Sequence, residues 1–518
     1  MYSSTPHNST AHSDTHLRAR RFHFATDMSM TCAGATFDMH TVAPVSPYAR
    51  LQRLQRQLAA GCPLRLAAVG GSSTAGHQLA RDSTSLYQMR LAARINRSFP
   101  HHEHLVINSG TPASGPQYME KCLSSQLPAA VNLVIVEYSQ NIDMTTQADG
   151  LALERLLRRL LRWPSAPAIM YLSLPTRNEA FGKGETHTRT GSTAQTKWAQ
   201  PLTSHYGIPH VRPRWPAERV AALFQEGSST ILDSKAVHPT DAGHRVVVAS
   251  LIQTLEEAWA APVAGVADPL PAPLYSRSSA VHESVNELMT TPHGRDRWDG
   301  HISDAGGSQP NTELPDSLCV GGAELSPFVQ HAEGFTATLE GTALHPKPGL
   351  VASTAGAHLS LCYNVSVACQ SGASSEKRCP RVGSVLLGAI GYLRSYDGMM
   401  GDARATCSGG CSCDGADEVE LLEGWHSQKT SVTWISWMAL RINTPLEKYA
   451  RGEYGARCPC HVHVRTQPRK HAREPSRTNR SKFKVNMMML SYEGRMDWVD
   501  SWKAQHLAVG DRRRKLRT

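Results

Sequence analysis

The chain lacks any long hydrophobic run. No stretch of its 518 residues approaches the roughly 18 consecutive apolar residues that a membrane-spanning helix needs. The first residues, MYSSTPHNSTAHSDTHLRARRFHF, contain no apolar core of the kind found in signal peptides. We therefore expect no integral membrane segment, and no signal peptide is visible.

Aromatic residues are scarce, at 6% of the chain, although a hydrophobic content of 40% is enough to build a core. The formal net charge of +10 concentrates in two basic runs, at 465–484 and 511–518. No nucleic-acid-binding motif accompanies these runs. We interpret them as solvated charge and expect no nucleic-acid partner.

Cysteine is unevenly distributed, because nine of the twelve cysteines follow residue 300. This density predicts disulfides and an oxidising compartment, which favours a secreted or secretory-pathway protein. Because no signal peptide is visible, thiols that stay reduced are the open alternative. The spacing of Cys407, Cys411 and Cys413 matches no strong zinc-binding pattern, so we expect disulfides there and no metal site. The nine are Cys319, Cys362, Cys369, Cys379, Cys407, Cys411, Cys413, Cys458 and Cys460.

The composition changes along the chain and predicts separate segments. The N-terminal part is polar and aperiodic, and a later stretch, APVAGVADPLPAPLYSRSS, is rich in Pro and Ala. The expected segments are a disordered stretch at 1–45, an α/β domain at 46–260, a linker at 261–280, a Cys-containing β-rich domain at 281–505 and a basic tail at 506–518.

Within 46–260, short continuous apolar runs alternate with helical patterns. Such runs, bounded by turn residues, are typical of strands buried on both faces of a parallel sheet. The alternation predicts a three-layer α/β domain with a parallel sheet. Beyond residue 281, short apolar stretches between Gly, Ser and Cys clusters predict a β-rich, sandwich-like domain. The expected strands are 64–70, 104–110, 131–138 and 166–174, and the expected helices are 46–61, 83–99, 149–163, 193–206 and 241–259.

Polar residues occur in four separated stretches, three of them directly after predicted strands. Because reactive groups gather at the carboxyl ends of parallel strands, Ser72, the turn after Asn108, and Asn141 should lie together. Each stretch alone has an ordinary interpretation, since small polar residues and loop histidines are common in turns. The four are VGGSSTAG (69–76), VINSGTPASGPQYMEKC (106–122), VIVEYSQNID (134–143) and DSKAVHPTDAGHR (233–245).

In this order the stretches resemble the Ser, Gly, Asn and His blocks of the SGNH/GDSL hydrolase superfamily. The chain is most similar to algal and protist proteins in which such a domain precedes a Cys-containing β-rich region. Residues 70–76 resemble the family's Gly-Asp-Ser-x-Thr/Ser-x-Gly block, with Gly71 in place of the Asp. The resemblance covers 64–255 and implies a flavodoxin-like three-layer domain.

The resemblance implies that Ser72 is the nucleophile and that Ser73 fills the variable position. A serine hydroxyl needs a neighbouring base to take its proton, and His238 is the candidate because imidazole titrates near neutral pH. The family has an Asp three residues before this His, where this chain has Lys235. We favour Asp233 as the acid that orients His238.

A literal Asp-x-x-His occurs at Asp241 and His244. An Asp at this position suits the start of the last helix, so we expect Asp241 to have a structural role. A Ser–His dyad without a working Asp is the open alternative.

The resemblance also implies three donors for a developing oxyanion. They are the backbone N–H of Ser72, a backbone N–H from the second block, and the side chain of Asn141. Alignment from Asn108 puts Ala113 where the family commonly has Gly, with Gly115 two residues on. A backbone donor tolerates Ala, so the site can form with either residue.

Together these observations favour a serine ester hydrolase that deacylates a carbohydrate or cell-wall polysaccharide, or transfers the acyl group to a sugar hydroxyl. The expected partner is a small ester or an acylated carbohydrate, and the chemistry needs no metal or organic cofactor. The alternative is a weak or inactive relative that acts as a polysaccharide-binding or cell-surface module. Gly71 and Lys235 favour that alternative.

Overall fold

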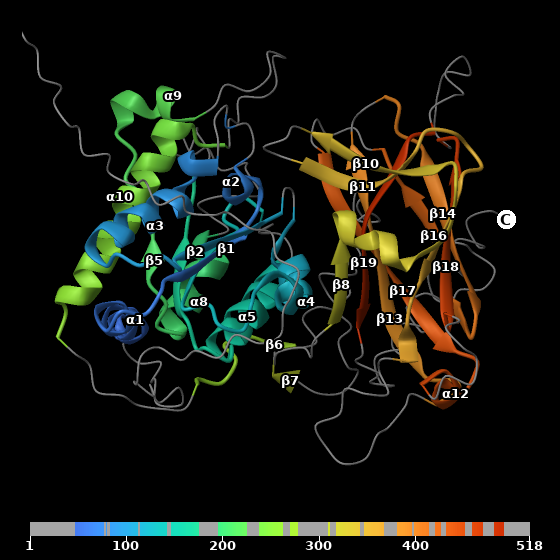
Figure 1. Cartoon of the computed structure of the whole chain (residues 1–518), viewed down its shortest axis with the longest axis horizontal. Coiled ribbons are helices and arrows are strands. Elements are labelled where there is room, and N and C mark those ends of the chain that lie inside the picture. The colour runs from blue at the N-terminus through green and yellow to red at the C-terminus, as the bar shows by residue number, and fades with distance from the viewer. Residues whose placement is uncertain are drawn as a thin grey trace, which may run out of the picture.

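The computed structural model has two parts, an α/β part and a β-rich part, which lie side by side (Figure 1). The predicted N-terminal disordered segment, the basic tail and much of the linker lie outside the residues that the structure describes. Those residues are 47–76, 79, 83–111, 114–141, 147–175, 195–224, 238–262, 270–277, 309–310, 317–341, 346–366, 381–395, 398–413, 420–425, 431–450, 458–469 and 481–491.

The α/β part contains a five-stranded parallel sheet in the order β2-β1-β3-β4-β5. The four predicted strands are confirmed, and β5 was not predicted because two residues are too short to show an apolar pattern. Gly70 of β1 pairs with Gly110 of β2 and Glu137 of β3, so three strands end together. The strands are β1 (Arg65–Gly70), β2 (Leu105–Gly110), β3 (Leu133–Glu137), β4 (Ala168–Leu172) and β5 (His210–Val211).

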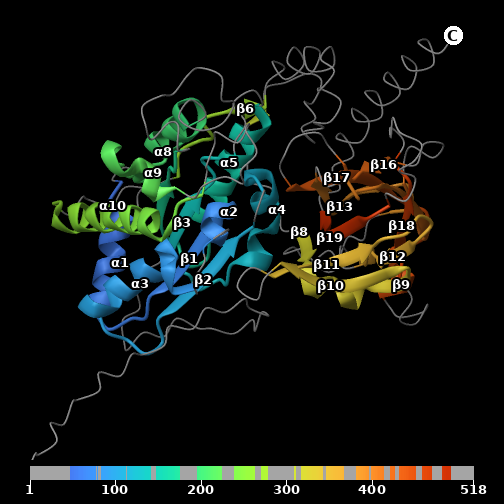
Figure 2. The ribbon, with the colours of Figure 1, turned by 90° about the horizontal axis from the view of Figure 1, so that it is seen from above.

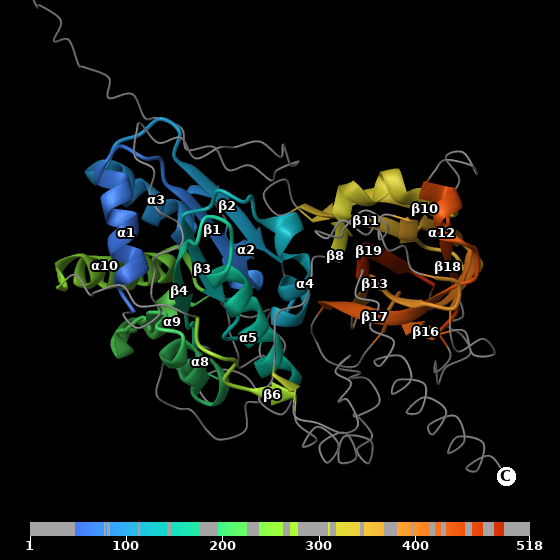
Figure 3. The same cartoon turned by 90° about the horizontal axis from the view of Figure 1, so that it is seen from below.

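Helices cover both faces of this sheet, which confirms the three-layer prediction (Figures 2 and 3). One face packs against α1 (Ala49–Ala59), α3 (Tyr87–Ser98) and α10 (Asp241–Ala260). The other face packs against α4 (Pro116–Gln126), α5 (Gln147–Leu161) and α8 (Gln200–His205). Alternate residues of β1 point to opposite faces, as expected for a strand buried on both sides. The shorter helical elements are α2 (Ser72–Ala75), η1 (Ser83–Ser85), η2 (Gln195–Ala199), η3 (Ala217–Arg219) and α9 (Val220–Leu223).

The β-rich part consists of antiparallel sheets, which confirms the predicted fold class. A seven-stranded sheet has the order β10-β11-β19-β13-β17-β15, with β8 paired to β19, and a five-stranded sheet has the order β16-β14-β18-β12-β9. Their inner faces share one hydrophobic core. The strands are β8 (Ser317–Gly321), β9 (Val329–Glu333), β10 (Phe335–Gly341), β11 (Pro346–Ala352), β12 (His358–Cys362), β13 (Val385–Ser395), β14 (Asp402–Gly409), β15 (Cys411–Cys413), β16 (Glu420–Glu423), β17 (Ser431–Ile442), β18 (Cys460–Gln467) and β19 (Phe483–Ser491), with η5 (Gly322–Phe328) and α12 (Leu446–Ala450) between them.

The outer face of the seven-stranded sheet packs against the α/β part. Cys319, Ala389 and Met487 belong to the same buried cluster as Met119 and Cys122 of α4. The disulfide Cys122–Cys319 joins α4 to β8 covalently. The two parts are therefore connected by an apolar interface and a covalent bond as well as by the chain.

The predicted disulfides are confirmed. Cys122–Cys319, Cys362–Cys458, Cys407–Cys413 and Cys411–Cys460 are bonded, and Cys62 is disulfide-bonded as well. No helix among the described residues is long and apolar enough to span a membrane.

Part of the predicted linker is fastened to the α/β part. The backbone N–H of Tyr275 donates to Glu154 on α5 at 3.2 Å, and Arg158 donates to the carbonyl of Pro271 at 2.6 Å. Residues 270–277 also carry β6 (Ser276–Arg277), which pairs with β7 (Gln309–Pro310).

Removing the disulfide between the two parts should destabilise the protein more than removing a local one. The sequence separation is 197 for Cys122–Cys319 and 6 for Cys407–Cys413. Because the longer loop loses more chain entropy when closed, the two double Cys→Ala variants should differ by about 3 kcal/mol in free energy of unfolding. Urea unfolding followed by circular dichroism measures the difference. Equal midpoints for the two variants would contradict the expectation.

Candidate active site

The turn after β1 is packed tightly against the ends of its neighbours. A Cβ on Gly70 would lie 2.2 Å from Thr74 Oγ1 and 2.5 Å from the carbonyl oxygen of Glu137, and one on Gly110 would lie 2.4 Å from the backbone nitrogen of Ala75. The N–H of Gly71 donates to the same Glu137 carbonyl at 3.2 Å. Glycine is therefore required here, because only a residue without Cβ lets α2 lie this close to the sheet.

The two serines of α2 point to different partners. Ser72 is half-buried, and its Oγ lies 2.8 Å from Nε2 of His238. Ser73 is 2% exposed, and its hydroxyl donates to Gln140 Oε1 at 3.1 Å. Only the first hydroxyl lies within hydrogen-bond distance of the imidazole predicted to act as a base.

His238 is held by the segment that leads into α10. The N–H of Thr240 donates to the carbonyl of Leu223 at 2.9 Å, and Pro239 forms a β-bridge with Phe224. Thr240 also caps α10, because its Oγ1 accepts from the N–H of Gly243 at 3.2 Å. These contacts fix the backbone beside His238 against the end of α9.

Asn141 lies over the glycine that replaces the family's Asp. A Cβ on Gly71 would lie 2.1 Å from Asn141 Oδ1, so no larger residue fits at 71 while Asn141 stays in place. Gly115, which precedes α4, lies beside the Asn141 backbone, since its Cβ would be 3.3 Å from the Asn141 carbonyl oxygen. The structure thus brings Gly71, Gly115 and Asn141 together at the edge where Ser72 lies.

Asn108 is directed elsewhere, because its Oδ1 accepts from the N–H of Gly110 two residues along its own chain. Two further predicted residues, Ala113 and Asp233, lie outside the described residues, as does Lys235.

The literal Asp-x-x-His pair has partners of its own. Asp241 is ion-paired with Arg90, at 2.5 Å, and with Arg245. His244 is 1% exposed, stacks on Tyr87, and its Nδ1 accepts from the Tyr87 N–H at 3.2 Å. Burial, assisted by the nearby Arg90, lowers the pKa of His244 to about 4, so this imidazole is neutral in the core.

A buried carboxylate lies directly beneath the site and was not predicted. Glu137 is fully buried at the end of β3, where Thr74 Oγ1 donates to its Oε2 at 3.1 Å and Ser139 Oγ donates to its Oε1 at 2.9 Å. Thr74 belongs to the helix that carries Ser72, and Ser139 belongs to the loop that carries Asn141. Glu137 therefore links the two loops from below.

Burial raises the pKa of Glu137 to about 7, although hydrogen bonds from Ser139 and Thr74 act in the opposite direction. Tyr87 extends this network, since its hydroxyl lies 3.0 Å from Thr74 Oγ1. A charged residue at the end of an otherwise apolar strand, LVIVE, is the signal that sequence reasoning passed over.

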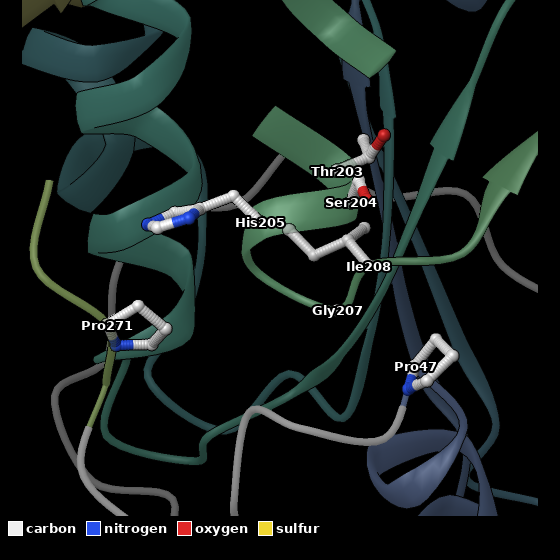
Figure 4. A pocket seen from close by; sticks show the side chains of 7 residues that line it. All are labelled: Pro47, Thr203, Ser204, His205, Gly207, Ile208 and Pro271. Atoms are coloured by element: carbon white, nitrogen blue, oxygen red, sulfur yellow. The ribbon is translucent and has the colours of Figure 1, made fainter. Parts of the chain in front are cut away.

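A cavity of about 490 Å³ lies away from these residues (Figure 4). Gly207 and Ile208 lead into the amino end of β5, whereas Ser72 follows the carboxyl end of β1. The cavity therefore lies toward the opposite edge of the parallel sheet from Ser72. Its lining residues are Pro47, Thr203, Ser204, His205, Gly207, Ile208 and Pro271.

The fold is similar to that of known esterases, although no protein-family model and no curated protein matches the sequence. A two-domain esterase (CEX) active on acetylated mannans, co-crystallised with mannopentaose, has a TM-score of 0.51 and 18% identity, with 85% of this chain and 94% of that chain covered. A second structure of that esterase has a TM-score of 0.52 and 17% identity, with 86% and 96% covered. Axe2, an acetylxylan esterase from Geobacillus stearothermophilus, has a TM-score of 0.28 and 13% identity, with 37% and 93% covered. The structural similarity to SGNH-type esterases is thus confirmed at the level of the fold.

The raised pKa of Glu137 should make stability depend on pH. In the unfolded chain this carboxyl ionises near its ordinary value of 4.5, and in the folded protein near 7. The folded state therefore binds this proton more tightly than the unfolded chain. The contribution of Glu137 to the free energy of unfolding is highest below pH 4.5 and falls by about 3 kcal/mol as the pH rises to about 7. Urea unfolding of the wild type and of Glu137→Gln, each at about pH 5 and about pH 8, measures it.

The Gln side chain keeps the size of Glu137 but cannot ionise, so the variant should lose this part of the pH dependence. An identical fall in stability for both proteins would show that other groups cause it.

Proposed function

We propose that the protein is a serine ester hydrolase of SGNH type that removes acyl groups from a carbohydrate. The hydrogen-bond distance of 2.8 Å between Ser72 Oγ and His238 Nε2 carries the proposal. It joins two residues 166 positions apart in the chain, at an edge of the sheet that also holds Asn141 and Gly115. A nucleophile, a base and hydrogen-bond donors are the groups that acyl transfer needs.

In the proposed reaction, Ser72 Oγ attacks the ester carbonyl while His238 Nε2 takes the hydroxyl proton. The resulting oxyanion accepts hydrogen bonds from the Ser72 N–H, from the Asn141 side chain, and from a backbone N–H at Ala113 or Gly115. His238 then gives its proton to the departing sugar oxygen, which leaves an acyl group on Ser72. Water, deprotonated by His238, releases the acid and restores the free serine.

The position of Asn141 supports its proposed role. Its side chain lies against Gly71, the residue directly before the nucleophile, and its backbone lies beside Gly115. Glu137 supports both sides of this arrangement through Thr74 and Ser139. Donors held in place before the substrate arrives need no reorganisation during the reaction.

The carbohydrate substrate is proposed from the architecture. The two-domain esterase active on acetylated mannans resembles this chain over most of both lengths, and one of its structures was co-crystallised with mannopentaose. We propose an acetylated polysaccharide as the substrate, with the acetyl ester cleaved in the α/β part. Transfer of the acyl group to a sugar hydroxyl instead of water would use the same residues.

Replacing Ser72 with Ala should lower kcat for p-nitrophenyl acetate by about 10⁴-fold or more, because no other hydroxyl takes its place. Ser73→Ala is the matched control, since the Ser73 hydroxyl donates to Gln140 and not to His238. This variant should keep most of the wild-type kcat. Equal rates for wild type and Ser72→Ala would remove the basis of the proposed function.

Asp233 is proposed to orient His238, and Asp241 is not. Asp233→Asn should lower kcat by about 10³- to 10⁴-fold with little change in KM, because a misoriented imidazole cannot take the proton. Asp241→Asn breaks the ion pair with Arg90 and should change the unfolding midpoint more than kcat. Steady-state kinetics of both variants decides between the two acids. The reverse pattern would assign the role to Asp241.

A further inference from the structure

The five-stranded sheet carries a group of histidines on its outward face. Along β18, Cys460, Val462 and Val464 point into the core, so the alternate residues point outward. This sheet lies on the side of the β-rich part away from the α/β part (Figures 1 and 2). The outward histidines are His461 and His463 of β18, His358 of β12 and His331 of β9.

These imidazoles contact one another. His358 Nε2 lies 3.1 Å from His463 Nδ1, and His463 Nε2 lies 2.7 Å from the hydroxyl of Ser408 on β14. The ring of His331 is centred 5.2 Å from that of His358, and His461 stacks on His463 at 6.1 Å. Four imidazoles from three strands thus form one continuous group, which we call the histidine face.

Arginines add positive charge to the histidine face. Arg404 of β14 and Arg465 of β18 are paired in register, and Arg465 is also in register with His358. Like charges directly opposite each other in a sheet are destabilising. Glu333 of β9 is the one carboxylate among the described outward residues in register with this row, and it lies 3.7 Å from His331.

The charge of this face depends on pH. Burial lowers the pKa of His358 and of His463 below the ordinary histidine value, and neighbouring imidazoles lower both further. At neutral pH the rings of His358 and His463 are neutral, and the two arginines face one glutamate. Acidification adds charge to these two imidazoles, and the repulsion between them favours a bound anion.

We propose that the histidine face binds an anionic polysaccharide that bears uronate groups, and that binding is coupled to proton uptake by the histidines. Uronate carboxylates stay ionised at a pH where imidazole is protonated, so attraction is greatest in mildly acidic conditions. Adjacent strands are about 4.8 Å apart, so Arg404, Arg465 and His358 form a short row across the sheet that can contact more than one carboxylate. Arginine offers each carboxylate a paired set of donors.

The basic runs of the sequence are accompanied by no nucleic-acid-binding motif, which argues against a nucleic acid as the ligand. Imidazole and guanidinium planes can stack on bases, so the test includes an oligonucleotide. The proposal does not depend on the proposed esterase activity, because the histidine face shares no residue with the Ser72 site. Ser72→Ala should therefore bind the polysaccharide as the wild type does.

The test measures binding of an oligogalacturonate to the full chain by isothermal titration calorimetry, at about pH 5 and about pH 7.5. We expect binding at least about tenfold tighter at the lower pH, since each coupled proton contributes up to a factor of ten per pH unit. Titration in buffers of different ionisation enthalpy should register proton uptake. A malto-oligosaccharide of equal length, which carries no charge, should not bind.

The double variant His358→Gln/His463→Gln should lose the tighter binding at low pH. His102→Gln/His205→Gln is the matched control, because it removes two histidines of the α/β part and should bind as the wild type does. Binding that is independent of pH, that survives in the first double variant, or that EDTA abolishes would overturn the proposal. Equally tight binding of a single-stranded oligonucleotide at about pH 5 would overturn it too. Thermal unfolding of each variant checks that the sheet is intact.

Discussion

The arrangement of the candidate site depends on one buried carboxylate. Glu137 ends β3, and its two oxygens accept hydrogen bonds from Thr74 and Ser139, on the two sides of the site. Its backbone carbonyl holds the N–H of Gly71. Loops at a sheet edge would otherwise be free to move relative to each other. A buried group that accepts a hydrogen bond from each side fixes their separation.

The position at which the family motif has Asp is crowded in this structure. The N–H of Gly71 donates to the backbone carbonyl of Glu137, and Asn141 Oδ1 occupies the space in which a side chain at position 71 would begin. A larger residue at 71 would therefore require the Asn141 side chain to move.

Much of the fold could be predicted because burial on both faces leaves a clear apolar pattern. The strands of the α/β part and the disulfide-rich β part follow from such patterns and from cysteine density. The short β5 could not be predicted, since two residues carry no periodicity, and α4 is absent from the expected helices because its apolar spacing is weak. Ser72 and His238 lie together as their order along the chain suggested. An acidic residue at the end of an apolar run marks Glu137 in the sequence, but its partners Thr74 and Ser139 could not be predicted, because their proximity depends on the tertiary structure.

Helix α4 belongs to both parts of the molecule. It begins beside Gly115 at the candidate site and carries Cys122, which is bonded to Cys319 of β8. A protease that cut the chain anywhere between α10 and β8 would therefore not separate the two parts under oxidising conditions. The nicked protein would remain one particle, because the disulfide still joins the β-rich part to the helix that begins at the candidate site. Such a protein tolerates damage to its connecting segment in a way that a pair of domains joined by the chain alone does not.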